Sequence, residues 1–187
     1  MSRIADQIIH YALLFEGVKE KGNNQGWEDV YFEELDKTFQ ELMEEVGWQR
    51  SHAWCAYFAE LIWKLSYKHY DHPLFFKLDN LFSASVMNTW YNFKRSNFVC
   101  SNEPKEGSVV IWNLYSKGKS TTRGHAGIVV SVEGNVVHTV EGNTSGTNRR
   151  DGDQVAMKSF IVDYKGKKNG LNLVGFIHPT PIDKYFI

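Results

Sequence analysis

The sequence predicts one α+β domain, in which N-terminal helices pack on a mostly antiparallel β-sheet. In the first 95 residues, apolar side chains recur at helical spacing. Beyond Cys100, the pattern changes to short Val- and Ile-rich runs separated by glycine-containing turns. No internal repeat or low-complexity linker interrupts residues 1–187, so we expect a single domain over that range.

Helices are expected at residues 2–16, 28–46, 53–68 and 83–95. Glycines at positions 17 and 47 end the first two helices, and a loop around His72-Pro73 separates the last two. Ser51 is a candidate N-cap for the third helix, which would place Cys55 near the start of that helix.

Strands are expected at residues 108–112, 126–132, 135–141, 154–163 and 171–177. Residues 116–124 contain no apolar side chain and are predicted to form a polar loop, and residues 143–152 a long exposed one. Gly134-Asn135 favours a tight turn between two paired strands. Paired residue numbers would then sum to about 269, which brings His125 close to Glu141 and Asn143, within a slip of one or two residues.

Composition and charge exclude several function classes. With 42% hydrophobic residues, the chain can bury a sizeable core. A net charge of −1 gives no overall field toward nucleic acid or an anionic membrane, so neither partner is expected. No segment approaches the ~18 apolar residues of a membrane span, and the N-terminus does not resemble a signal peptide. We expect synthesis in the cytoplasm, and release or delivery by another system for any action outside.

The strongest chemical signal is a cysteine with potential partners. At a helix start, free N–H groups and the helix dipole favour the thiolate of Cys55. His125 stands at the mouth of a strand between glycines and could act as its base. Glu141 or Asn143 could orient the imidazole, and the sequence leaves that choice open. The alternative for Cys55 is an ordinary buried apolar residue.

Other titratable residues are given structural interpretations. His138 lies mid-strand and is expected to pack in the core, while Cys100 lacks a histidine or glycine context and is expected to be structural. His69 and His72 flank Asp71, but a loop pair without a third ligand is more often solvated. We therefore expect no metal site.

Three residues near the proposed nucleophile and base are candidate substrate-binding residues: His52, Trp54 and Trp112. Trp48 could also form a cleft wall. All three tryptophans could equally belong to the core, and His52 could simply precede the helix. Arg149-Arg150 is interpreted as exposed charge.

At these positions the sequence resembles the CHAP amidases, cysteine- and histidine-dependent amidohydrolases and peptidases of the papain-like group. The resemblance spans nearly the whole chain. The stretches that carry it are Trp54-Cys55-Ala56-Tyr57-Phe58, Gly124-His125-Ala126-Gly127-Ile128-Val129, Val140-Glu141-Gly142-Asn143, Pro104 to Trp112, Glu20 with Asn24 and Gly26, and Gly175 to Pro179.

The resemblance implies a papain-like architecture and hydrolysis of an amide bond in bacterial peptidoglycan. The bond would join N-acetylmuramoyl sugar to L-alanine, or lie in the stem peptide or cross-bridge. Cys55 would be the nucleophile, His125 the base, Glu141 the orienting group and Asn143 a fourth member. No metal or other cofactor would take part. Some members bind calcium through acidic residues before the nucleophile, but residues 46–52 contain no carboxylate, so no calcium is expected.

Two other hypotheses stay open. One is a wall-binding module that keeps the fold but does not cut, and the other is a papain-like peptidase acting on a protein. Peptidoglycan is the expected partner, with an immunity or delivery protein as a further candidate. No wall-binding domain is evident in the sequence, so targeting would come from the groove, a partner or delivery at the wall.

Overall fold

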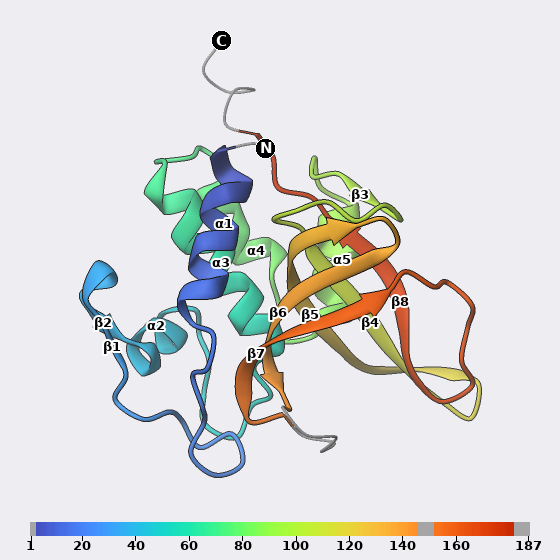
Figure 1. Ribbon diagram of the computed structural model, residues 1–187, viewed down its shortest axis with the longest axis horizontal. Coiled ribbons are helices and arrows are strands. Elements are labelled where there is room, and N and C mark those ends of the chain that lie inside the picture. The colour runs from blue at the N-terminus through green and yellow to red at the C-terminus, as the bar shows by residue number, and fades with distance from the viewer. Residues whose placement is uncertain (1–2, 146–151, 182–187) are drawn as a thin grey trace.

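In the computed structural model, which describes residues 3–145 and 152–181, helices cover one face of a six-stranded sheet (Figure 1). Neighbouring strands are antiparallel, in the order β3-β8-β4-β5-β6-β7, which confirms the predicted α+β class. The elements are α1 (Arg3–Leu14), β1 (Tyr31–Phe32), η1 (Glu33–Leu35), β2 (Lys37–Thr38), α2 (Phe39–Glu45), α3 (Cys55–His69), α4 (Phe75–Leu81), α5 (Val86–Lys94), β3 (Cys100–Ser101), β4 (Val109–Ser116), β5 (Lys119–Glu133), β6 (Val136–Thr144), β7 (Gln154–Ile161) and β8 (Gly170–Ile177).

The helical predictions are confirmed for α1, α3 and α5, but the prediction of one helix over residues 28–46 is wrong. Its first half is the small hairpin β1–β2 around the 3₁₀ turn η1, which closes at Asp36 with φ +53°. Helix α2 begins only after Thr38, whose side chain accepts from the Glu41 N–H while the Glu41 carboxylate accepts from the Thr38 N–H. This reciprocal capping box sets the start of the helix. Helix α4, which buries Leu78, was not predicted.

The predicted N-cap of the third helix is also wrong. Ser51 has φ +71° and lies in the preceding turn, where its N–H donates to the Asn24 carbonyl at 2.6 Å. The residue that caps α3 is Trp54, and its side chain makes no capping hydrogen bond. The helix still begins at Cys55, so the predicted placement of the cysteine in its first turn is confirmed.

The predicted polar loop at residues 116–124 is in fact mostly strand. Strand β5 begins at Lys119 and pairs with β4 through Tyr115↔Ser120 and Asn113↔Gly124. The turn consists of Lys117 and Gly118, both with positive φ. This end of the hairpin projects away from the core, so its side chains are polar although its backbone is extended.

The predicted tight turn at Gly134-Asn135 is confirmed. Paired residue numbers sum to 269 from Glu133↔Val136 to Ser131↔His138, and an irregularity then shifts the register by one, to Ile128↔Val140. The later strands appear as β7 and β8. Of the predicted loop at 143–152, residues 146–151, with Arg149-Arg150, lie outside the described residues, and β6 itself continues to Thr144.

The sheet buries side chains on both faces. Helices α1, α3 and α5 pack on the face that presents Val109, Ile111, Ile128 and Val140. A smaller cluster on the other face includes Trp112, whose ring lies 5.0 Å from that of Phe160. Because β4 and β7 are not neighbours, the sheet must curl to bring these rings together. Among the described residues, no helix is long and apolar enough to span a bilayer.

Candidate active site

The first turn of α3 holds Cys55 against the histidine of β5. Burial alone would raise the pKa of the Cys55 thiol, which is only 7% exposed. The hydrogen bond and charge of His125, with the N–H groups of Ala126 and Ala56, outweigh that effect and lower the pKa. The site therefore favours a thiolate, the nucleophilic form of cysteine.

The histidine ring lies between the thiol and a carboxylate. His125 Nε2 is 2.8 Å from Glu141 Oε2, which leaves Nδ1 to face the Cys55 sulfur. Burial would lower the pKa of His125, but the hydrogen bonds to Cys55 and Glu141 raise it. The pair thus favours a thiolate beside an imidazolium.

The carboxylate is itself fixed and kept ionised. Thr139 Oγ1 donates to Glu141 Oε1 at 2.7 Å, so each carboxylate oxygen has a partner. Although burial would raise the pKa of Glu141, bonding to His125 and Thr139 and the charge of Lys158 lower it. Gly127 provides the necessary room, because a Cβ there would lie 2.7 Å from Glu141 Cγ.

Asn143 has a different place from Glu141, which resolves the choice that the sequence left open. With its amide oriented so that both polar groups are satisfied, the nitrogen donates to the Gly152 carbonyl at 2.7 Å. Its oxygen accepts from the Trp54 N–H at 3.2 Å. Asn143 therefore ties the end of β6 to the start of α3, while Glu141 contacts the histidine.

Trp54 is a core residue, so the prediction that its side chain binds substrate is wrong. The side chain is fully buried and packs edge-on against Trp27. Its Nε1 donates to Glu20 Oε2 at 2.6 Å, and Glu20 Oε1 accepts from the Asn24 N–H at 3.0 Å. Glu20 and Asn24 thereby fasten the N-terminal loop to the residue that caps α3.

Trp112 is largely buried and stacks on the imidazole, with 5.7 Å between ring centroids and 29° between planes. Its contact with His125 supports the histidine ring, whereas its predicted part in binding substrate stays a prediction. His52 is exposed before α3, where its Nδ1 lies 3.4 Å from the Tyr57 hydroxyl. His52 thus remains a candidate substrate-binding residue.

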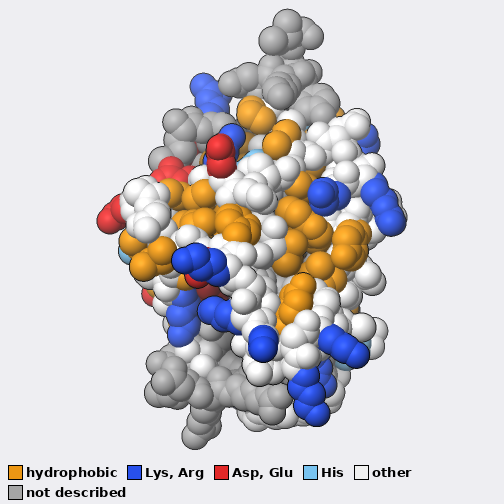
Figure 2. All heavy atoms as spheres, turned by 90° about the vertical axis from the view of Figure 1, so that its right-hand side faces the viewer, with side chains coloured by type: hydrophobic (Ala, Val, Ile, Leu, Met, Phe, Trp, Pro, Cys, Tyr) orange, Lys and Arg blue, Asp and Glu red, His pale blue; other side chains and the backbone are white. Residues whose placement is uncertain are grey.

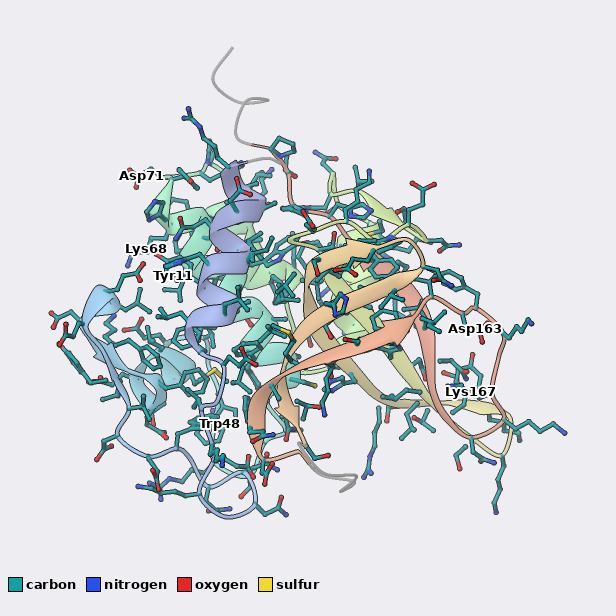
Figure 3. All side chains as sticks on the ribbon, in the orientation of Figure 1. Tyr11, Trp48, Lys68, Asp71, Asp163 and Lys167 are labelled. Carbon is teal, nitrogen blue, oxygen red and sulfur yellow. The ribbon has the colours of Figure 1, made fainter. Side chains whose placement is uncertain are left out.

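Trp48 is 3% exposed and packs against Trp27, so the alternative of a core residue is the correct one (Figure 3). Its Nε1 donates to the His52 carbonyl at 2.9 Å, which fixes the loop that leads into α3. This bond was not predictable from residue types, because it joins a side chain to a backbone carbonyl.

The remaining titratable residues lie apart from Cys55. His138 is half-buried rather than packed in the core, and its Nδ1 shares a hydrogen bond of 2.8 Å with Ser159 Oγ. Burial raises the pKa of the half-buried Cys100 to about 11, which fits a structural thiol. His72 is buried, and its Nδ1 accepts from the Leu74 N–H. Within residues 3–145 and 152–181, no cluster of three His, Cys, Asp or Glu is arranged to hold a metal ion.

Sequence reasoning missed two contributors to the site, Thr139 and Gly127. Thr139 precedes Glu141 by two positions on one strand, so the period of two could have placed both on the same face. Gly127 follows His125 by the same spacing, but its lack of a side chain predicted only room for the imidazole and not its contact with Glu141.

Comparison with known proteins gives one match. The CHAP domain family matches residues 47–143, just over half of the chain, and this range holds Cys55, His125, Glu141 and Asn143. CHAP domains are generally hydrolases, associated with amidase or peptidase activity on peptidoglycan. Neither a curated protein nor a solved structure matches the chain. The matched range covers the start of α3 with Cys55 and the strands that carry His125 and Glu141, and it shows that the chain belongs to the CHAP domain family.

Proposed function

We propose that this protein hydrolyses an amide bond of bacterial peptidoglycan with Cys55 as nucleophile. The observation that carries the proposal is the continuous chain from the Cys55 sulfur through the His125 ring to the Glu141 carboxylate. In this environment the cysteine thiolate is an activated nucleophile that can accept the acyl group of an amide substrate. The family match supports peptidoglycan as the source of the amide.

In the acylation step, the Cys55 thiolate attacks the carbonyl carbon and the carbonyl electron pair moves to oxygen. Collapse of the tetrahedral intermediate breaks the C–N bond, and the His125 imidazolium gives its proton to the departing amine. The products are a free amine and a thioester on Cys55. Glu141 holds the imidazole ring and stabilises its charged form throughout.

The start of α3 offers a donor for the developing oxyanion. The Cys55 N–H lies in the first helical turn, where no preceding helical carbonyl can accept its hydrogen. The neighbouring Trp54 N–H is held by Asn143, so Asn143 fixes the backbone that presents this donor. Preorganised N–H donors of this kind stabilise the tetrahedral intermediate.

In the deacylation step, water attacks the thioester while neutral His125 accepts its proton. The new C–O bond replaces the C–S bond, which releases a carboxylic acid and regenerates the thiolate–imidazolium pair. The same chemistry serves the muramoyl–alanine amide, a stem-peptide bond or a cross-bridge bond. An endolysin-like protein or a delivered lytic effector, acting at the wall after release, fits this activity, and an immunity or delivery partner stays a prediction.

The test is digestion of purified sacculi by the wild-type protein, Cys55→Ala and Cys100→Ala, with the products identified by mass spectrometry. The wild type and Cys100→Ala should release fragments with new amine ends, and Cys55→Ala should release none. The masses then identify the bond. Sacculi that stay intact while being bound would favour the wall-binding module. Cleavage of an unfolded protein substrate without sacculus digestion would favour the protein peptidase.

A further inference from the structure

Two lysine-rich turns lie side by side at the end of the sheet away from α1 and α3 (Figure 1). One is the β4–β5 turn at Lys117-Gly118, and the other is the connection between β7 and β8, residues 162–169. The Gly118 N–H donates to the Lys168 carbonyl at 2.8 Å, and the Lys117 N–H donates to Asn169 Oδ1 at 2.8 Å. The fold therefore holds the two turns together.

These turns and the start of β5 form what we call the cationic surface. Its members are the exposed side chains Lys117, Lys119, Arg123, Lys165, Lys167 and Lys168. In the described part of the chain, no salt bridge to a carboxylate involves any of the six. Figure 2 shows Lys and Arg side chains over this side of the molecule with few Asp or Glu among them.

The cationic surface contrasts with the charge of the whole chain. The whole chain carries −1, yet residues 117–123 and 162–169 together contain these six cations and one acidic residue, Asp163, which lies on the same connection as Lys167 (Figure 3). An oxygen of Asp163 accepts from the Lys165 N–H, so this carboxylate also shapes the backbone. Cations held together without compensating acids repel one another, an arrangement that binding of a polyanion would relieve.

The cationic surface is connected to the candidate active site by one strand. Lys119 begins β5, and the same strand carries Arg123 and then His125. At about 3.3 Å per residue, His125 lies roughly 20 Å along the strand from Lys119. A polymer held on the cationic surface would therefore stay close to the candidate active site.

The residue types indicate which anion fits. Five of the six cations are lysines, whose compact, flexible ammonium groups bind phosphate as point charges and impose no fixed geometry on the anion. All six side chains are exposed on the surface, so recognition of an anion here would depend on charge density rather than on shape. A flexible polymer with a phosphodiester in every repeat supplies phosphate groups at high charge density and does not need a shaped pocket.

We propose that the cationic surface binds a phosphodiester-linked anionic polymer of the bacterial wall and holds the enzyme against its substrate. The proposal rests on the function proposed above, since it assumes that the protein works at the wall. It assigns a wall-targeting role to this end of the sheet.

The test is cosedimentation with sacculi that retain phosphodiester polymers and with the same sacculi stripped by hydrofluoric acid. The charge variant combines Lys119→Gln, Lys167→Gln and Lys168→Gln. The matched control removes three exposed lysines elsewhere, by Lys68→Gln, Lys77→Gln and Lys94→Gln. Each lysine near an anionic surface contributes about a factor of five, so the charge variant should bind polymer-bearing sacculi about 100-fold more weakly than the wild type.

Two further results are expected. The control should bind like the wild type, and wild-type binding should weaken on stripped sacculi and as salt is raised. Equal binding by the charge variant, an equal loss in the control, or unchanged binding to stripped sacculi would overturn the proposal. So would tighter binding to phosphatidylglycerol vesicles or duplex DNA than to polymer-bearing sacculi. Digestion is scored separately, so binding without cleavage would reject the hydrolase alone, and cleavage without charge-dependent binding would reject the cationic surface alone.

Discussion

At the residue scale, the site depends on three groups whose charges stabilise one another. Burial works against the charged form of Cys55, His125 and Glu141 alike, and hydrogen bonding between them overcomes it. The pKa of the thiol is lowered and that of the imidazole is raised, so the ion pair exists between those two values. As pH falls, the thiolate is protonated, and as pH rises, the imidazolium is lost.

Glu141→Gln tests the contribution of the carboxylate. The amide can still accept from His125 but no longer stabilises its positive charge, so the pKa of His125 should fall. We expect kcat to decrease about 100-fold or more, and the alkaline limb of the pH–kcat profile to move to lower pH. The measurement is kcat against pH for both proteins.

Asn143→Ala is the matched comparison, because Asn143 touches the α3 start rather than the imidazole. The alkaline limb of the pH–kcat profile of Asn143→Ala should lie at the same pH as that of the wild type. If the Glu141→Gln limb also stayed in place, Glu141 would not stabilise the imidazolium.

At the element scale, the start of α3 is fixed from outside the helix. Trp54 contributes no side-chain cap, and the positions of Trp54 and Cys55 depend on Glu20, Asn143 and the packing of Trp27. Gly142 lets β6 approach the helix, because a Cβ there would lie 2.6 Å from Phe58 Cβ. Distant segments therefore determine where the nucleophile stands.

Glu20→Ala should destabilise the fold through the start of α3. The buried indole N–H of Trp54 would lose its partner, at a cost of about 1–3 kcal/mol in the free energy of unfolding. Urea denaturation measures the change, and exposed Glu16→Ala is the control. A loss no greater than that of Glu16→Ala would mean that Glu20 does not hold Trp54.

At the scale of the whole molecule, local signals made some features predictable. The Gly134-Asn135 turn predicted that His125 lies close to Glu141 and Asn143, because a hairpin register follows from its turn, here to within a shift of one residue. The role of Asn143 was not predictable, since its partners, the Trp54 N–H and the Gly152 carbonyl, come from other parts of the fold. The helix predicted over 28–46 failed because apolar spacing alone does not locate the start of a helix, which the Thr38–Glu41 capping box fixes here.

The cationic surface shows a further limit of sequence reasoning. Net charge averages over the chain, so a value of −1 gave no sign that two distant lysine-rich segments would meet. Their contact depends on the pairing of β8 with β4, in which Tyr115 lies opposite Gly170. Residue types were visible in the sequence, but their juxtaposition required the sheet.

The most direct test of the central claim is the pH dependence of alkylation at Cys55. Iodoacetamide labelling of Cys55 and Cys100 is followed by peptide mass spectrometry in the wild type and in His125→Ala. We predict that Cys55 reacts with a midpoint well below the ordinary thiol value of about 8.5, that Cys100 does not, and that His125→Ala raises the Cys55 midpoint. A Cys55 midpoint near 8.5 that is unchanged in His125→Ala would contradict an activated thiolate.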